Sequence, residues 1–327
     1  METRILGRKG RPVSVIGLGT WQLGADWGDV DPADARAVLE ASLEEGVTFY
    51  DTADVYGDGR SERFLREFLA AHPDAGITVA TKMGRRVPQE PENYTLDNFR
   101  QWTDRSRRNL GVDTLDLVQL HCPPTPVYES DAVFDALDTL TEEGAIAAYG
   151  VSVEETGQAL TAIARPNVAS VQIILNAFRL KPLDEVLPAA AEAGVGIIAR
   201  VPLASGLLSA KYTEDTTFAE NDHRTYNRRG EAFDVGETFS GVEFESGVAA
   251  SREFAQLVPE GMTAAQAALA WVAQLPEVST VIPGARNPRQ ARMNAAAGSL
   301  SDLGDDFRRR AREIYDRYFR EAVHSRW

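Results

Sequence analysis

Residues 115–152 read LDLVQLHCPPTPVYESDAVFDALDTLTEEGAIAAYGVS, and this stretch decides the fold. It begins with an apolar run at 115–121 and ends with another at 147–152, each of the length of a buried strand. Between them, apolar residues recur at the spacing of one helix face: Val133, Leu137 and Leu140. Two strands of one sheet that are joined by a helix run in the same direction, so the stretch predicts a βαβ unit.

The same alternation continues in both directions along the 327 residues. The runs that we interpret as strands are Val13–Leu18, Thr48–Asp51, Thr78–Lys82, Leu115–His121, Ala147–Ser152, Val168–Gln172, Gly196–Arg200 and Val278–Ile282. Helix start signals lie between them, with Asp31 before Pro32, Asn287 before Pro288, and Thr263 three residues before Gln266. Eight such units predict an α/β fold, a (β/α)₈ TIM barrel, because an open doubly wound sheet usually has fewer strands. No linker divides the chain, so we expect residues 1–327 to form a single domain.

Three further segments are expected outside the eight units. Residues Thr3–Leu6 could pair with Ser14 and Val15 as an N-terminal hairpin that closes the barrel floor. The stretch 213–245 lacks periodicity but carries aromatic residues, so it is either a lid that orders on a ligand or a mobile surface loop. The chain then ends in a C-terminal surface helix whose apolar residues have helical spacing: Phe307, Ala311, Ile314, Tyr318 and Ala322.

The composition indicates an ordinary globular protein. Hydrophobic residues make up 43% of the chain, and 34 Lys and Arg stand against 49 Asp and Glu, a formal net charge of −15. A phosphate backbone or an anionic bilayer would be repelled on average, so neither nucleic acid nor membrane is expected as a partner. The single cysteine, Cys122, is typical of a reducing compartment, and we expect a cytoplasmic protein.

Three consecutive predicted strands end in an ionisable residue, namely Asp51, Lys82 and His121. The carboxyl ends of barrel strands face one common mouth, so these side chains are expected to meet there. Each follows an apolar run, where an unpartnered charge would be costly. The short loop 52–57 can bring the hydroxyl of Tyr56 back over the same mouth.

Tyrosine titrates at about 10, so Tyr56 can donate a proton only where a neighbour stabilises the phenolate. Lys82 would supply that positive charge, and Asp51 would pair with Lys82 and hold it. His121 would donate a hydrogen bond to a carbonyl oxygen and orient it beside the tyrosine. The four residues predict acid catalysis on a carbonyl group.

Other interpretations fit parts of this pattern. Asp51 and Lys82 alone would also fit a buried ion pair. Gly17-Leu18-Gly19 begins like a dinucleotide fingerprint, but Gln22 stands where the third glycine is needed, so close packing between strands fits it better. No other histidine stands at ligand spacing from His121, so no metal is expected.

Three segments resemble signatures of the aldo-keto reductase family: FYDTADVYG at 49–57, ATKMG at 80–84 and DLVQLH at 116–121. The resemblance extends from GLGTW at 17–21 to IPGAR at 282–286, with Gln290 and Asn294 beyond. It implies a (β/α)₈ barrel that reduces aldehydes and ketones with NADPH and without a metal. It also implies a catalytic tetrad of Asp51, Tyr56, Lys82 and His121.

The resemblance further implies where the adenosine end of NADPH lies. Arg286 would contact the 2′-phosphate, with Gln290 and Asn294 near the adenine and Arg289 as a second candidate. The helix that starts here offers free backbone N–H groups, which favour a phosphate. The sequence has Gly284-Ala285 where some members have a Lys-Ser pair, so the preference for NADPH over NADH depends mainly on Arg286.

For the nicotinamide end, the family pattern implies that Ser152 and Gln172 bind the carboxamide and that Arg200 stacks on the ring. The segment 203–212 resembles the loop that covers the pyrophosphate in the family, and Lys211 would contact the negative charge of the pyrophosphate. By its residues alone, the segment would also fit an ordinary loop between two elements. The full set of expected cofactor contacts is Gly19, Thr20, Trp21, Ser152, Gln172, Arg200, Pro202, Leu203, Gly206, Leu208, Lys211, Ile282, Gly284, Arg286, Gln290 and Asn294.

Trp21 and Trp27 follow the first strand and either line a substrate pocket or pack in the core. The predicted function is therefore NADPH-dependent reduction of a small carbonyl compound to an alcohol, which can be reversible, by a monomer or a homo-oligomer. The alternative is an NADPH-binding regulatory or sensor subunit with little turnover, resembling the ion-channel β subunits of the same superfamily. A metal-dependent barrel hydrolase would need paired histidines on an early strand, which this sequence lacks.

Overall fold

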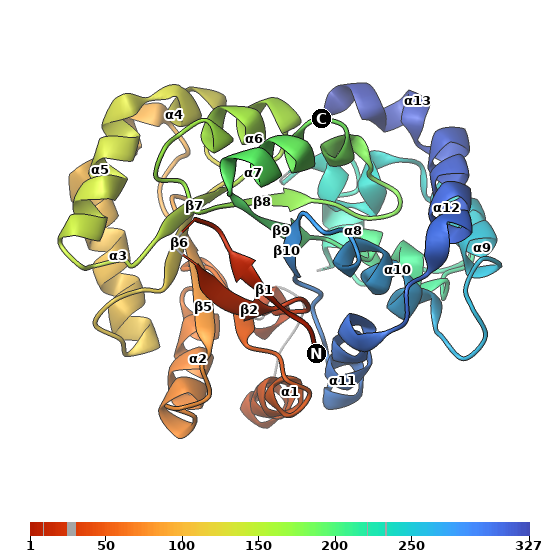
Figure 1. Ribbon diagram of the computed structural model, residues 1–327, viewed down its shortest axis with the longest axis horizontal. Helices are drawn as coiled ribbons and strands as arrows, with labels where there is room; N and C mark the ends of the chain where they lie inside the picture. The colour runs from red at the N-terminus through yellow and green to blue at the C-terminus, as the bar shows by residue number, and fades with distance from the viewer. Residues whose placement is uncertain (9, 25–30, 221, 233) are drawn as a thin grey trace.

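A parallel sheet forms the centre of the protein in a computed structural model that describes all residues except 9, 25–30, 221 and 233. Over the described ranges, eight strands follow one another around this sheet in chain order: β3 (Leu18–Gly19), β4 (Phe49–Asp51), β5 (Thr78–Met83), β6 (Leu117–His121), β7 (Tyr149–Ser152), β8 (Ser170–Ile174), β9 (Gly196–Arg200) and β10 (Val278–Val281). Parallel bridges from Ile16 to Val281 and from Gly19 to Gly284 join the first strand to the last. The sheet closes, and the predicted (β/α)₈ barrel is confirmed (Figure 1).

A hairpin closes one end of the barrel. Strands β1 (Thr3–Leu6) and β2 (Arg11–Ser14) pair antiparallel, with Thr3 opposite Ser14, and lie across that end in Figure 1. The hairpin contributes two side chains to a cluster of buried residues that otherwise comes from the barrel strands and their ends: Leu6, Val13, Phe49, Ala80, Leu117, Ala148, Ala169, Ile198 and Ile282. The predicted hairpin is confirmed, and its apolar residues help to fill the barrel from below.

The first predicted strand, Val13–Leu18, is wrong as a single element. Its beginning belongs to β2 in the hairpin, and its end is β3 in the barrel. The chain changes partners between them at Gly17, where a Cβ would lie 2.9 Å from the carbonyl oxygen of Phe49. Both halves are apolar and buried, so hydrophobicity alone could not reveal the change of partner.

Helices surround the barrel (Figure 1). Over the described ranges the α-helices are α1 (Pro32–Glu44), α2 (Arg60–Ala71), α3 (Leu96–Leu110), α4 (Thr125–Glu129), α5 (Asp131–Glu142), α6 (Thr156–Ile163), α7 (Val186–Ala193), α8 (His223–Tyr226), α9 (Phe244–Ala255), α10 (Ala264–Ala273), α11 (Pro288–Ala296), α12 (Gly304–Tyr318) and α13 (Arg320–Val323). The predicted N-caps are confirmed: the Asp31 side chain accepts from Ala33, Asn287 accepts from Gln290, and Thr263 with Gln266 forms a capping box. These caps fix where the helices after the mouth loops begin.

The stretch 213–245 folds into short pieces over the barrel mouth. Besides α8, it contains the 3₁₀ turns η5 (Val235–Glu237) and η6 (Phe239–Gly241). Phe239 and Phe244 are buried and pack on each other with ring centroids 4.9 Å apart. Phe239 and Phe244 belong to the main hydrophobic core, so they anchor this part of the segment to the body of the protein.

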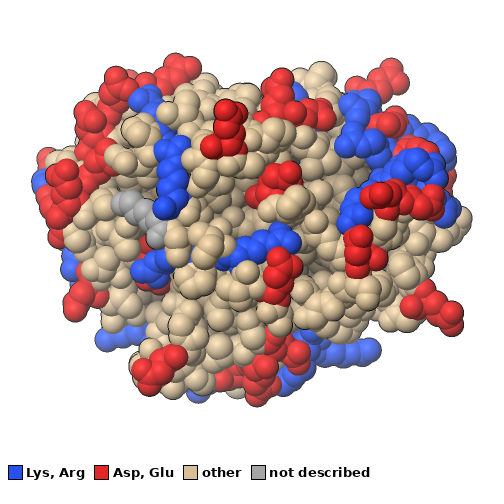
Figure 2. All heavy atoms as spheres, in the orientation of Figure 1, with Lys and Arg blue, Asp and Glu red and all other residues tan. Residues whose placement is uncertain are grey.

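The surface mixes both signs of charge, as Figure 2 shows for one face. On the C-terminal helix α12 the arginines pair with nearby acids, Arg308 with Asp302 and Arg309 with Asp306. No helix in the described part of the chain is both long and apolar enough to span a bilayer.

Candidate active site

The catalytic candidates lie at the carboxyl ends of consecutive strands, as the barrel requires. Asp51 and His121 are the last residues of β4 and β6, and Lys82 is the penultimate residue of β5. All three are buried, and neighbouring strands place their backbones side by side. The sequence therefore brings these groups to one rim through strand order alone.

Tyr56 reaches this rim because the loop after β4 is tightly held. The backbone N–H of Asp54 donates to the carbonyl oxygen of Lys82. Gly57 has a φ of +57°, and a Cβ at this residue would lie 2.0 Å from the carbonyl oxygen of Gly24. Only glycine fits this close approach, and it turns the tyrosine back over the strand ends.

The Lys82 ammonium joins three groups. Its Nζ donates to Asp51 Oδ1 at 2.5 Å and to the carbonyl oxygen of Thr52 at 2.8 Å. It also donates to the Tyr56 hydroxyl at 3.3 Å. Burial by itself would lower the pKa of Lys82, but Asp51 and Tyr56 raise it above its ordinary value, so the ammonium remains charged.

Tyr56 is held in the protonated form. Burial raises the pKa of its phenol above the ordinary value of about 10, while the Lys82 ammonium opposes that rise. Asp51 and Glu237 act in the same direction as burial. The phenol therefore carries its proton at neutral pH, and Lys82 stands ready to stabilise the phenolate once that proton leaves.

His121 is neutral at physiological pH. Burial, together with the positive charges of Arg85, Lys82 and Arg200, lowers the pKa of His121 well below its ordinary value of 6.5. Its ring meets the Tyr56 ring edge-on, with centroids 5.9 Å apart. Its Nδ1 is buried and has no hydrogen-bond partner within the described part of the chain. A neutral imidazole can donate a hydrogen bond to a carbonyl oxygen without competing with Tyr56 as the acid.

Asp51 is oriented by two glutamines. Its Oδ2 accepts hydrogen bonds from Gln119 Nε2 at 3.2 Å and from Gln172 Nε2 at 2.7 Å. Gln119 lies on β6 with its side chain buried, and the sequence analysis missed it because an inward polar residue on a strand resembles any other strand position. These bonds leave Oδ1 directed at Lys82 and so fix the ammonium beside the phenol.

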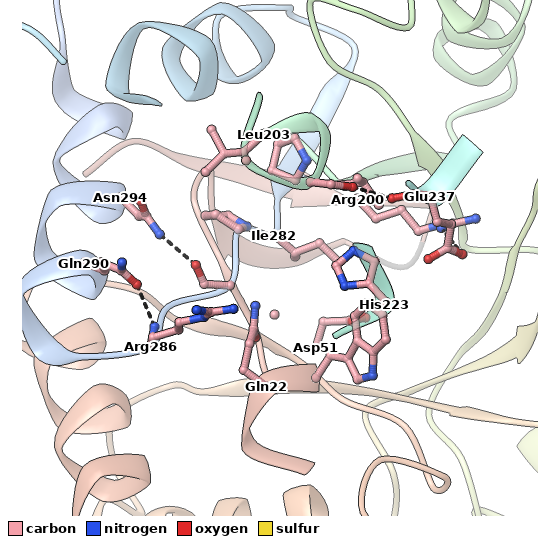
Figure 3. A pocket seen from close by; sticks show the side chains of 18 of the residues that line it. Gln22, Asp51, Arg200, Leu203, His223, Glu237, Ile282, Arg286, Gln290 and Asn294 are labelled. Atoms are coloured by element: carbon pink, nitrogen blue, oxygen red, sulfur yellow. Dashed lines mark hydrogen bonds and ion pairs between the residues drawn. The ribbon is translucent and has the colours of Figure 1, made fainter. Parts of the chain in front are cut away.

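A cavity of about 570 Å³ opens at this rim (Figure 3). Tyr56, His121 and Asp51 line it. The other predicted site residues in its lining are Gly19, Trp21, Ser152, Gln172, Arg200, Pro202, Leu203, Gly206, Lys211, Ile282, Gly284, Arg286, Gln290 and Asn294. One hollow thus brings together the predicted proton donor and most of the predicted cofactor contacts.

Four predicted residues are placed differently. Lys82 lies behind Tyr56 and outside the lining. Thr20 is fully buried, and its hydroxyl donates to the backbone oxygen of Asp51 at 2.8 Å, so it supports the site from behind. Leu208 is also fully buried and outside the lining, so we expect no direct ligand contact from it. Trp27 lies outside the described residues.

The side of the cavity that is predicted to hold the adenosine is a turn that leads into α11. The Gln290 side chain accepts from the backbone N–H of Arg286 at 2.8 Å, and the Asn294 side chain donates to the oxygen of Gly284 at 3.1 Å (Figure 3). A Cβ on Gly284 would overlap the Gln22 side chain. Asn287 caps the helix, whose first N–H groups and positive dipole end are suited to an anion.

The cations at this end fit a phosphorylated ligand. The Arg286 side chain is half exposed, and its Nη2 lies 3.8 Å from Asp222 Oδ2. Lys211 is exposed and lines the same cavity. Two cations in the lining of one cavity match the charge of a dinucleotide phosphate, so the residues present fit NADPH or NADH.

On the opposite side, Arg200 meets a residue that the sequence analysis missed. Its Nη1 donates to Glu237 Oε1 at 2.6 Å, and its Nη2 donates to the backbone oxygen of Val153 at 3.0 Å (Figure 3). Glu237 belongs to the aperiodic stretch 213–245, where no pattern distinguishes one acidic residue from another. Arg85, His223 and Arg224 also line the cavity and were missed. Arg85 follows β5, whereas His223 and Arg224 lie on the short helix α8 within the same aperiodic stretch.

Asp54 is a buried carboxyl that the proposed chemistry does not use. Both of its oxygens lack a hydrogen-bond partner in the described part of the chain. Burial, together with Glu62, raises the pKa of Asp54 to about 7, against the opposing charges of Arg86 and Arg105. A carboxyl with a raised folded-state pKa stabilises the protein fully below its unfolded pKa of about 4, and this contribution is lost as the pH rises toward 7.

We therefore expect Asp54→Asn to change the pH dependence of stability. Between pH 5.5 and 8.5, the free energy of unfolding of the wild type should fall relative to the variant by about 2 kcal/mol. Urea unfolding of both proteins at the two pH values measures this difference. Parallel pH profiles for the two proteins would show that Asp54 is ionised at both values.

Comparison with known proteins agrees with this site. Residues 15–316 match the model of the aldo/keto reductase family. An uncharacterised oxidoreductase of Mycobacterium tuberculosis is 33% identical over 88% of this chain and 85% of its own length. A probable voltage-gated potassium channel subunit beta of Arabidopsis thaliana is 28% identical, covering 93% of each chain.

A solved structure supports the same family. The glycerol dehydrogenase AKR11B4 of Gluconobacter oxydans superposes with a TM-score of 0.79 at 30% identity, over 97% of this chain and 95% of that one. The family match covers nearly the whole barrel, including each strand end that carries a catalytic candidate. The chain belongs to the aldo/keto reductase family and is an oxidoreductase.

Proposed function

We propose that this protein reduces an aldehyde or ketone to an alcohol with NADPH, and that Tyr56 donates the proton to the carbonyl oxygen. The observation that carries the proposal is the 3.3 Å contact between Lys82 Nζ and the Tyr56 hydroxyl at the cavity wall. When bound, NADPH supplies the hydride that reduces the carbonyl carbon. The residues described above supply the proton and the orientation of the substrate.

The protein groups act in a simple order. The neutral His121 ring and the Tyr56 hydroxyl both donate hydrogen bonds to the carbonyl oxygen and polarise it. As negative charge develops on that oxygen, Tyr56 gives up its proton and the Lys82 ammonium stabilises the phenolate. Asp51, held by the two glutamines, keeps the ammonium in place. The reverse reaction uses the same groups and is favoured by alkaline pH, because it needs the phenolate.

The test is a fluorescence titration with NADPH and NADH, followed by turnover of an aldehyde panel. The likeness to a glycerol dehydrogenase adds glycerol, as a substrate for the oxidation direction, to the panel. We expect NADPH to bind and to be consumed with several aldehydes. Tight NADPH binding without turnover of any aldehyde or alcohol would instead favour a regulatory subunit, the alternative that the likeness to a potassium channel β subunit supports.

Arg286 is proposed to bind the 2′-phosphate, which only NADPH carries. We expect Arg286→Ala to weaken NADPH binding by about tenfold to a hundredfold and to leave NADH binding within about twofold, since a charge-assisted hydrogen bond contributes about 1.5–3 kcal/mol. Titration of both nucleotides measures the two dissociation constants. Arg289, the second candidate, lies on the first turn of the same helix but outside the cavity lining, so we expect Arg289→Ala to leave both dissociation constants within about twofold. Equal losses for NADPH and NADH would exclude a role in recognising the 2′-phosphate.

A further inference from the structure

The part of the cavity next to the catalytic residues is polar and charged. Arg85 and Glu237 both line it, together with Tyr56 and His121. The two come from different places, because Arg85 follows β5 and Glu237 belongs to η5 in the segment over the mouth. Neither residue is part of the catalytic set proposed above.

Arg85 is fixed to the catalytic histidine. Its Nε donates to the backbone oxygen of His121 at 3.0 Å, and its Nη2 lies 3.6 Å from Glu154 Oε1. No hydrogen bond occupies Nη1 among the described residues, and the side chain is 23% exposed. The guanidinium thus retains donors next to the group that would orient the carbonyl.

Glu237 is fixed from the other side. Only Oε1 is held by Arg200, and Oε2 has no hydrogen-bond partner in the described part of the chain. Burial favours the neutral acid, but Arg200 and Arg85 hold the pKa of Glu237 below its ordinary value. The carboxylate is therefore ionised at neutral pH and presents an acceptor to the cavity.

The charges around this pair are balanced. Two arginines, Arg85 and Arg200, stand against two glutamates, Glu154 and Glu237. An anionic substrate would gain from Arg85 but be repelled by Glu237. An apolar substrate would cover the partly buried donor and acceptor and leave them without partners, which is costly. A neutral molecule that offers both a hydroxyl donor and an oxygen acceptor satisfies both groups.

We propose that Glu237 and Arg85 determine substrate specificity, and that they select a carbonyl compound bearing hydroxyl groups on the carbons next to the carbonyl. The hydroxyl hydrogen is donated to Glu237, and a substrate oxygen accepts from Arg85. This inference rests on the proposed reductase function and identifies the substrate class of the same site.

The experiment compares glyceraldehyde with propanal, which has the same three-carbon chain and no hydroxyls. We expect the wild type to favour glyceraldehyde in kcat/KM, calculated per free aldehyde. Glu237→Gln should lower the ratio of the two kcat/KM values by about tenfold or more, since a site that binds a hydroxyl discriminates strongly against the analogue without it. Hydration of the aldehydes cancels when variant and wild type are compared. Arg85→Gln should lower the same ratio.

Glu243→Gln is the matched control, because it removes an exposed carboxylate of the same mouth segment from outside the cavity lining. It should leave the ratio within about twofold. A wild type that shows no preference, or that prefers the anionic aldehyde glyoxylate, would overturn the inference, as would an equal loss on both substrates in Glu237→Gln. Failure of the proposed function gives a different result, because then no aldehyde is reduced by the wild type.

Discussion

Replacing Tyr56 by phenylalanine should reduce kcat for aldehyde reduction by about a thousandfold. The substitution removes the Tyr56 hydroxyl, which lines the cavity and lies 3.3 Å from the Lys82 ammonium, and leaves the ring that packs against His121 and Trp21. General acid catalysis by a positioned side chain contributes about a hundredfold to ten-thousandfold. Steady-state kinetics on one aldehyde at saturating NADPH gives the result.

Cofactor binding is the control for this variant. The predicted adenosine contacts lie on α11 and the turn before it, whereas Tyr56 lies in the loop after β4. The dissociation constant for NADPH should therefore stay within about threefold of the wild type. A variant that keeps more than a tenth of the wild-type kcat would show that another group delivers the proton.

Replacing Lys82 by methionine should damage both catalysis and folding. The phenolate would lose its stabilising cation, so kcat should fall by about a hundredfold or more. Asp51 is only 3% exposed and would lose its ion-pair partner, and removing one partner of a buried pair typically costs about 3–5 kcal/mol of unfolding free energy. Urea denaturation and steady-state kinetics measure the two effects.

The double variant Asp51→Asn with Lys82→Met separates the two effects. Neutralising Asp51 removes the unpaired charge, while a carbonyl oxygen remains to accept from Gln119 and Gln172. Much of the lost stability should return, and the activity should not. A double variant as unstable as Lys82→Met, or one that regains activity, would contradict the roles given to this pair.

Much of this site could be predicted because strand order places it. Asp51, Lys82 and His121 each end an apolar run, and parallel strands bring such ends to one rim whatever the details of packing. Tyr56 could be placed at the same rim because the loop that joins it to β4 is short. The hairpin at the barrel floor followed from the turn-rich residues between two apolar runs.

Other features depend on tertiary contacts that produce no periodic pattern in the sequence. Glu237 became part of the site because the stretch 213–245 folds back over the mouth and meets Arg200, a contact between residues 37 apart in the chain. Gln119 orients Asp51 from β6, two strands away in the same sheet. The prediction of one strand at Val13–Leu18 was wrong for a similar reason. The first part of this apolar run pairs with β1 in the hairpin, and its end pairs with β4 in the barrel.

The most direct test of the account uses NADPH carrying deuterium at the transferred position, with one aldehyde as the acceptor. Mass spectrometry of the product should find an alcohol with one deuterium on the former carbonyl carbon, formed in a one-to-one ratio with the oxidised nucleotide. An alcohol without the label, or labelled nucleotide that binds and is never consumed, would contradict the claim that this cavity joins a hydride donor to the proton of Tyr56.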